Sequence, residues 1–212
     1  MKNTLFAVAR AVLTALVILS GAIAVPILFR PFYWWHIGPL QLDEWMGLTA
    51  GQIKEAYGQM LDYCIGLSDT FSVGVLPFSP WGASHFVDVR NLFLLDLWAF
   101  AVGSVLLLAL CLLDRREHIR LKGHTPGYWS AVGVGVTFVV VGGLASLDFN
   151  AAFTVFHKLF FPGKDNWIFN GKEDPVIYIL PEEFFRNCAI LILVLILIAC
   201  AGLIIHDHYK DK

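Results

Sequence analysis

The sequence predicts an all-α membrane protein, in which four transmembrane helices form a bundle and two long outer loops form a helical layer at the membrane surface. Apolar residues make up 58% of the 212-residue chain and charged residues 15%, whereas soluble domains carry about 25% charged residues. The mean hydropathy is +0.68, and the apolar residues gather in four stretches almost free of charge. This pattern excludes a soluble, disordered or nucleic-acid-binding protein.

Each of the four stretches is long enough to cross a membrane. The predicted spans are residues 11–29, 91–113, 128–147 and 187–205. As helices they extend about 27–35 Å, which matches a hydrocarbon core of about 30 Å. No repeat, low-complexity segment or linker interrupts the chain, so residues 1–212 are predicted to form a single membrane domain.

The distribution of basic residues predicts how the bundle is oriented. Segments 1–10, 114–127 and 206–212 hold eight Lys and Arg residues in 31 positions, whereas segments 30–90 and 148–186 hold seven in 100 positions. Short loops rich in Lys and Arg stay in the cytoplasm. We therefore expect both termini in the cytoplasm and both long loops outside it.

The first span also has features of a signal peptide. Lys2 and Arg10 precede the apolar run, and residues 22–24 (Ala-Ile-Ala) resemble a cleavage site. The apolar run continues to Phe29, which is long enough to span. We expect a retained helix, and the predicted topology of the later spans is the same in either case.

Both outer loops contain segments with the pattern of surface helices. In the first loop, Thr49 and Gln52 form a capping box ahead of apolar residues at helical spacing. In the second loop, Phe149, Phe153, Phe156 and Phe160 share one helical face. Aromatic residues of this kind anchor chains at membrane interfaces, so the two loops are predicted to form a crown on the outer leaflet.

A histidine and a carboxylate stand at helical spacing just before the second span. His85 and Asp88 are three residues apart, so they lie on one face of a helix. A carboxylate placed this way can hold an imidazole in one tautomer and stabilise its protonated form, as a general base requires. His157 is predicted at a similar depth in the second loop. Two such histidines suit an acid and a base or a pair of metal ligands, and a haem site is disfavoured because neither lies deep within a span.

Asp96 lies inside the predicted second span, on the same stripe as His85 and Asp88. A carboxylate at the centre of a span costs about 2.5–3.5 kcal/mol on insertion. Asp96 is therefore expected to face the bundle or a water-filled cavity, where it has either a functional role or a structural one as a polar contact between helices.

Further titratable residues lie at the outer ends of the spans: Arg90, Asp148, Glu182, Glu183 and Arg186. Taken singly they are interpreted as interfacial anchors, but together they place titratable groups on one side of the membrane. His206 and His208 could bind a metal weakly, or belong to a solvated tail. No motif for an enzyme-borne nucleophile is present, and no metal or cofactor is predicted.

Three short motifs follow one another on the outer side of the predicted topology. They are His85-x-x-Asp88-Val89-Arg90, then His157, then Asp174-Pro175-x-Ile177-x-x-Leu180-Pro181-Glu182-x-Phe184-Phe185. Together with the four-span layout and the loop lengths, they resemble the lipoprotein intramolecular transacylase family over essentially the whole chain.

The resemblance implies a membrane acyltransferase of the bacterial plasma membrane. Such an enzyme moves the sn-2 acyl chain of a lipoprotein's S-diacylglyceryl-cysteine onto the α-amino group of that cysteine, which gives a lyso-form lipoprotein. The implied partners are the diacylglyceryl-modified lipoprotein and membrane lipids. The implied catalytic pair is His85 and His157, with Asp88, Arg90, Asp96, Asp148 and Glu183 as supporting residues.

The chemistry fits these residue types, because the substrate's own amine is the nucleophile. Our hypothesis makes His85 the base for that amine, oriented by Asp88. His157 then stabilises the tetrahedral oxyanion or protonates the departing glyceryl oxygen. The two roles can also be exchanged.

Two other functions remain open at this point. One is a non-enzymatic transporter or assembly factor, although transporters place polar groups near the bilayer midplane and spans one, three and four carry no charge. The other is an acyl-enzyme acyltransferase that uses Ser84 or Ser79.

Overall fold

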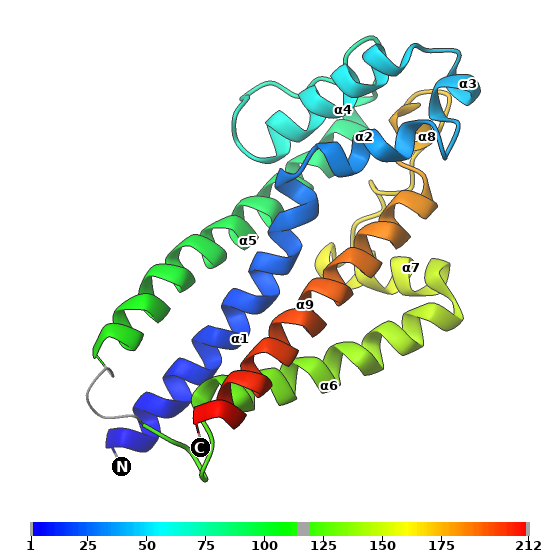
Figure 1. Cartoon of the computed structure of the whole chain (residues 1–212). Helices are drawn as coiled ribbons and strands as arrows, with labels where there is room; N and C mark the ends of the chain where they lie inside the picture. The colour runs from blue at the N-terminus through cyan, green and yellow to red at the C-terminus, as the bar shows by residue number, and fades with distance from the viewer. Residues whose placement is uncertain (1, 114–118, 211–212) are drawn as a thin grey trace. The chain divides into compact units, whose positions relative to one another are not determined.

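The computed structural model describes residues 2–113 and 119–210 (Figure 1). Three of the basic residues used to predict the orientation of the bundle lie outside these described residues: Arg115, Arg116 and Lys212. His118 also lies outside them. The predicted sidedness of the termini stays a prediction.

The regular secondary structure of the described residues is helical, apart from an isolated backbone bridge between Leu121 and His124. The helices are α1 (Lys2–Leu28), α2 (Pro31–Ile37), α3 (Leu42–Met46), α4 (Ala50–Cys64), α5 (Pro80–Leu113), α6 (Pro126–Leu147), α7 (Phe149–Phe160), α8 (Val176–Ile179) and α9 (Glu182–Lys210). Four of them, α1, α5, α6 and α9, are long and apolar enough to cross a membrane. The predicted all-α, four-span fold class is confirmed.

Helix α5 begins well before the span predicted from residue 91, because its helical backbone starts at Pro80 and continues through the polar residues that follow. A helix of its 34 residues is about 51 Å long at 1.5 Å per residue, which exceeds a hydrocarbon core of about 30 Å. One helix can therefore carry both a membrane span and a polar segment beyond it.

The chain divides into two compact units. Unit 1 comprises Met1–Val25, Asp96–Ser146 and Ile190–Lys212, and unit 2 comprises Pro26–Leu95 and Leu147–Ala189. The single membrane domain proposed for residues 1–212 stays a prediction.

Unit 1 is packed through small residues. In it, α6 and α9 lie side by side (Figure 1), and a Cβ added to Gly142 would lie 2.8 Å from the Leu193 side chain. Likewise a Cβ at Gly21 of α1 would lie 2.8 Å from the ring of Phe100 on α5. Helices gain little from the hydrophobic effect inside a bilayer, so close backbone approach at small residues supplies the packing.

Unit 2 contains the two long loops, and its helices α2, α4 and α8 surround an aromatic core. The rings of Tyr33 and Tyr57 stack at a centroid distance of 3.7 Å. Phe184 meets Tyr33 edge-on at 5.1 Å, and the Tyr33 hydroxyl donates a hydrogen bond of 2.7 Å to the Ile179 carbonyl. The capping box predicted at Thr49 is present at the start of α4.

Candidate active site

The first turn of α5 is fixed by a buried carboxylate from the other loop. Asp174 accepts hydrogen bonds of 2.7 Å from both the backbone N–H and the hydroxyl of Ser79, just before α5 begins. A Cβ at Gly82 would lie 2.3 Å from the Asp174 carboxylate, so this contact requires glycine. Asp174 thereby ties the α7–α8 segment to the helix that carries His85.

Unit 2 brings the two predicted catalytic histidines together. His85 lies on α5 and His157 on α7, with ring centroids 5.8 Å apart and ring planes inclined by 34°. Both side chains are buried, with 5% and 7% of their surface exposed. Residues 72 positions apart in sequence thus form one imidazole pair.

Aromatic rings enclose this pair. Phe161 contacts both imidazoles, with centroid distances of 5.0 Å to His85 and 5.7 Å to His157. Phe169 lies 5.6 Å from His85, and Trp167 lies 4.7 Å from His157. These three residues belong to the segment between α7 and α8, so this segment shields the pair from water.

The hydrogen bond made by His157 fixes its tautomer. Its Nδ1 lies 2.8 Å from the carbonyl oxygen of Phe153, one turn earlier on α7. A carbonyl oxygen only accepts, so Nδ1 carries a proton and Nε2 of the neutral ring carries the lone pair. Burial lowers the pKa of His157 below its ordinary value, although the bond to Phe153 acts in the opposite direction. His157 is therefore a neutral ring with a free basic nitrogen.

His85 has a different environment. Its Nδ1 is buried and has no hydrogen-bond partner among the described residues. A buried N–H without a partner is rarer than a buried acceptor without one. The neutral ring is therefore best described with the lone pair on Nδ1 and the proton on Nε2, which makes Nε2 a hydrogen-bond donor.

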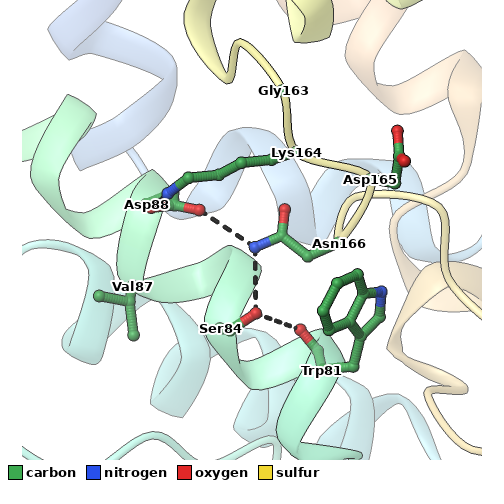
Figure 2. A pocket seen from close by; sticks show the side chains of 8 residues that line it. All are labelled: Trp81, Ser84, Val87, Asp88, Gly163, Lys164, Asp165 and Asn166. Atoms are coloured by element: carbon green, nitrogen blue, oxygen red, sulfur yellow. Dashed lines mark hydrogen bonds and ion pairs between the residues drawn. The ribbon is translucent and has the colours of Figure 1, made fainter.

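Asp88 has partners other than His85 (Figure 2). Its carboxylate pairs with Lys164 and accepts a hydrogen bond of 3.1 Å from the amide nitrogen of Asn166. The same amide nitrogen donates to the Ser84 hydroxyl at 3.0 Å. No hydrogen bond between Asp88 and His85 is found among the described residues, so the hypothesis that Asp88 orients His85 stays a prediction.

Among the described residues, no hydrogen bond or ion pair joins either histidine to the other predicted supporting residues. Arg90 donates to the Tyr63 carbonyl at 2.9 Å, near the end of α4. Asp148 caps α7 by accepting from Ala151 N–H at 2.9 Å. Glu183 is exposed on α9, and Asp96 belongs to unit 1.

Sequence patterns missed several residues of this region: Phe161, Lys164, Asn166, Trp167, Phe169 and Asp174 as the tie to α5. Asn166 is only 6% exposed, an unusual burial for an amide. Its loop position after a Pro-Gly pair gave no signal of that burial. Within residues 2–113 and 119–210, no group of three or more His, Cys, Asp or Glu side chains is arranged to hold a metal ion.

Comparison with solved structures supports the fold. The membrane-integral lipoprotein intramolecular transacylase Lit of Bacillus cereus matches with a TM-score of 0.89 and 23% identity, over 99% of this chain and 97% of that chain. Two structures of that protein with a histidine replaced, one by arginine and one by alanine, match with TM-scores of 0.80 and 0.74. The arginine variant is 23% identical to this chain, and the alanine variant is 24% identical. Each match covers 99% of this chain, and it covers 93% of the arginine variant and 95% of the alanine variant.

The curated proteins contain no sequence that matches this chain. A family model, in contrast, matches residues 8–185, and it describes the lipoprotein intramolecular transacylase Lit. This match extends over most of the chain and includes both histidines. The chain therefore belongs to the lipoprotein intramolecular transacylase family.

Proposed function

We propose that His85 and His157 catalyse transfer of the sn-2 acyl chain of an S-diacylglyceryl-cysteine to the α-amino group of the same cysteine. As a member of its family, the chain is a membrane acyltransferase that performs intramolecular transacylation. Because the chain belongs to an enzyme family, the transporter and assembly-factor alternatives no longer apply. The substrate is a diacylglyceryl-modified lipoprotein in the bilayer, and the product is its lyso form.

The reaction needs no nucleophile from the enzyme. The substrate amine attacks the ester carbonyl carbon and forms a C–N bond, and the amine loses one proton. The tetrahedral intermediate then breaks its bond to the sn-2 oxygen, which receives the proton that the base took from the amine and becomes the glyceryl hydroxyl. Holding both groups in one molecule supplies about 7–11 kcal/mol of the barrier when they are well oriented.

His157 is the base in this scheme. Its Nδ1–H is held by the Phe153 carbonyl, which leaves Nε2 free to take the amine proton. The lowered pKa keeps the ring neutral at pH 7. This assigns the base to His157, the exchanged form of the two-histidine hypothesis.

His85 is the hydrogen-bond donor. With its lone pair on the unpartnered Nδ1, its Nε2–H is available to stabilise the oxyanion of the tetrahedral intermediate. A donor placed where negative charge develops in a dry site is worth more than the same donor in water. The aromatic enclosure of the pair provides such a site.

The serine alternative has weak support. The Ser84 hydroxyl donates to the Trp81 carbonyl at 2.6 Å and accepts from Asn166. The Ser79 hydroxyl donates to Asp174 and accepts from the Gly82 N–H. Neither oxygen has a histidine as its hydrogen-bond partner, although histidine is the base that commonly activates a serine nucleophile.

In our proposal the site lies at the extracytoplasmic face of the bacterial plasma membrane, with both termini in the cytoplasm. The uneven distribution of basic residues supports this sidedness. Exposed tryptophans in the outer loops support a position at the membrane surface: Trp34, Trp35 and Trp45 are 40%, 64% and 80% exposed. Tryptophan favours that boundary, where one part of the ring is in lipid and the other in water.

The observation that carries the proposal is the buried imidazole pair with one tautomer fixed. The test is expression in a bacterial host whose lipoproteins keep free amino termini, followed by mass spectrometry of the lipopeptides. The mass of each lipopeptide should stay constant, while fragmentation should reveal an acyl group on the cysteine nitrogen. His85→Ala and His157→Ala, at normal membrane levels, should abolish this product.

His36→Ala is a matched control. His36 also lies in unit 2, and its Nδ1 contacts the carbonyl of Phe32 one turn earlier, at 2.6 Å. This variant should keep the activity, because His36 lies in the Tyr33 core rather than in the imidazole pair. Full conversion by either variant of the pair would refute the site assignment.

A further inference from the structure

A pocket of about 480 Å³, lined by both polar and apolar side chains, lies at the start of α5 (Figure 2). One wall is the first turns of α5, and the other is the segment that follows α7. The residues important here are Ser84, Asp88, Lys164, Asp165 and Asn166. Ser84 directly precedes His85 on α5 and Asp88 follows it about one turn later, so the pocket lies next to the turn of α5 that carries His85.

The pocket carries one uncompensated negative charge. The charges of Asp88 and Lys164 cancel, because these two side chains form an ion pair. Asp165 is exposed and has no side-chain partner among the described residues. Because Asp165 is one of the residues that line the pocket, a ligand bound there lies near a carboxylate that has no ionic partner.

Asn166 presents a hydrogen-bond acceptor without a partner. A carboxylate only accepts, so the Asn166 amide nitrogen must face Asp88. The amide oxygen is then directed elsewhere, and it is buried without a hydrogen-bond partner. A buried acceptor left unpaired is destabilising, so an N–H donor from a ligand would stabilise this arrangement.

The substrate of the proposed reaction has a part that fits such a pocket. Its two acyl chains are apolar and belong in lipid, whereas the polypeptide that continues from the reacting cysteine is polar and rich in N–H donors. That polypeptide begins a few bonds from the ester on which the imidazole pair acts. It must therefore leave the site through polar surroundings close to His85.

We propose that this pocket binds the lipoprotein residues immediately after the lipid-bearing cysteine, and that Asp165 makes it favour a basic over an acidic residue there. The inference rests on the proposed function and deepens it. Asp165 is a specificity-determining residue in this scheme, and the Asn166 oxygen accepts a hydrogen bond from the bound backbone.

The test uses three synthetic diacylglyceryl-cysteine peptides that differ only in the residue after the cysteine: lysine, serine or glutamate. The purified full-length protein is assayed in a zwitterionic detergent, because anionic lipid would attract basic peptides by itself. The wild type should convert the lysine peptide with a kcat/KM about fivefold above that of the glutamate peptide, the size expected for partly exposed charge contacts.

Charge reversal at Asp165 should invert the preference. Asp165→Lys is expected to convert the glutamate peptide faster than the lysine peptide. Glu173→Lys is the matched control, because Glu173 is exposed on the same segment and does not line the pocket. This control should keep the wild-type preference.

The outcomes separate the two proposals. If the serine peptide is converted but Asp165→Lys leaves the lysine-to-glutamate ratio unchanged, the pocket assignment fails and the proposed function stands. If Glu173→Lys shifts the ratio as much as Asp165→Lys, the effect is one of overall charge and the pocket assignment also fails. If no peptide is converted, both proposals fall.

Discussion

Two aromatic clusters of unit 2 are built alike but differ in how their buried polar atoms are satisfied. In one, Tyr33 is 1% exposed and packs against Tyr57 and Phe184, and its hydroxyl donates to the Ile179 carbonyl. In the other, His85 and His157 are packed by aromatic rings to a similar degree, yet the His85 Nδ1 has no hydrogen-bond partner.

This difference separates a structural core from a reaction centre. Most buried polar groups in proteins are hydrogen-bonded, because an unpaired one loses its hydration without compensation. The Tyr33 cluster follows that rule and holds α2, α4 and α8 together. In the histidine cluster, the His85 Nδ1 is buried without a hydrogen-bond partner, and the His157 Nε2 is left as a free basic nitrogen. Such unsatisfied atoms are expected of groups whose partner is a substrate.

The largest expected effect separates the two histidines from each other. His157→Gln should lower kcat about 10²–10⁴-fold, because an amide cannot act as the base. His85→Gln should lower kcat about tenfold, because the glutamine amide still supplies an N–H donor. The measurement is the initial rate of N-acyl product formation by purified variants on saturating diacylglyceryl-cysteine peptide.

Equal losses in the two glutamine variants would contradict the assignment of base and donor. A larger loss in His85→Gln would return the base to His85, as in the other form of the two-histidine hypothesis. Near-normal rates in both would remove the imidazole pair from the mechanism.

The next effect tests the structural cluster. Phe184 is 4% exposed and contacts Tyr33, Tyr57, Phe32 and His36. Phe184→Ala should destabilise the protein by about 3–5 kcal/mol, through lost burial and the cavity left behind. Thermal unfolding in detergent measures this loss.

Trp45→Ala is the comparison for that variant. Trp45 is 80% exposed, so its removal in detergent should leave the midpoint of unfolding almost unchanged. If both variants unfold at the wild-type temperature, the Tyr33 cluster is not the structural core of unit 2.

The fold was predictable because hydropathy and charge act over short distances in sequence. Spans, surface helices and the capping box at Thr49 depend on residues within a few turns. A short sequence motif, His85-x-x-Asp88-Val89-Arg90, was enough to predict that His85 is a catalytic residue. Its actual surroundings depend on the α7–α8 segment, which lies about 80 residues further along the chain.

The role of Asp88 illustrates that limit. Spacing on α5 places Asp88 one turn from His85, which made it the natural partner. The Lys164 ammonium and the Asn166 amide compete for the same carboxylate, and a charged partner forms the stronger hydrogen bonds. Such competition is decided by tertiary structure, so local spacing could not reveal it.

A smaller effect is expected from the Tyr33 hydroxyl. Tyr33→Phe keeps the ring stack but leaves the Ile179 carbonyl buried without its donor. The expected cost is about 1–3 kcal/mol of stability, with no change in kcat. Denaturation and rate measurements on one preparation test both parts, and a rate loss at unchanged stability would contradict the separation of the two clusters.

The smallest expected effect is a shift in pH dependence. His157 acts as a base only when neutral, so kcat should fall as the pH drops through the His157 pKa. Burial lowers that pKa below 6.5, which places the acid limb below pH 6.5. Trp167→Ala opens the ring to water, so the His157 pKa should rise and the acid limb should move to higher pH.

Phe169→Ala is the control for the pH shift, since Phe169 contacts His85 and no contact with His157 is found. The substrate amine also titrates, near pH 7.7–8.0 in ordinary peptides, but its contribution is common to all three enzymes and cancels in the comparison. A limb that moves in Trp167→Ala and stays in Phe169→Ala assigns the proton acceptor to His157, whereas the opposite pattern assigns it to His85.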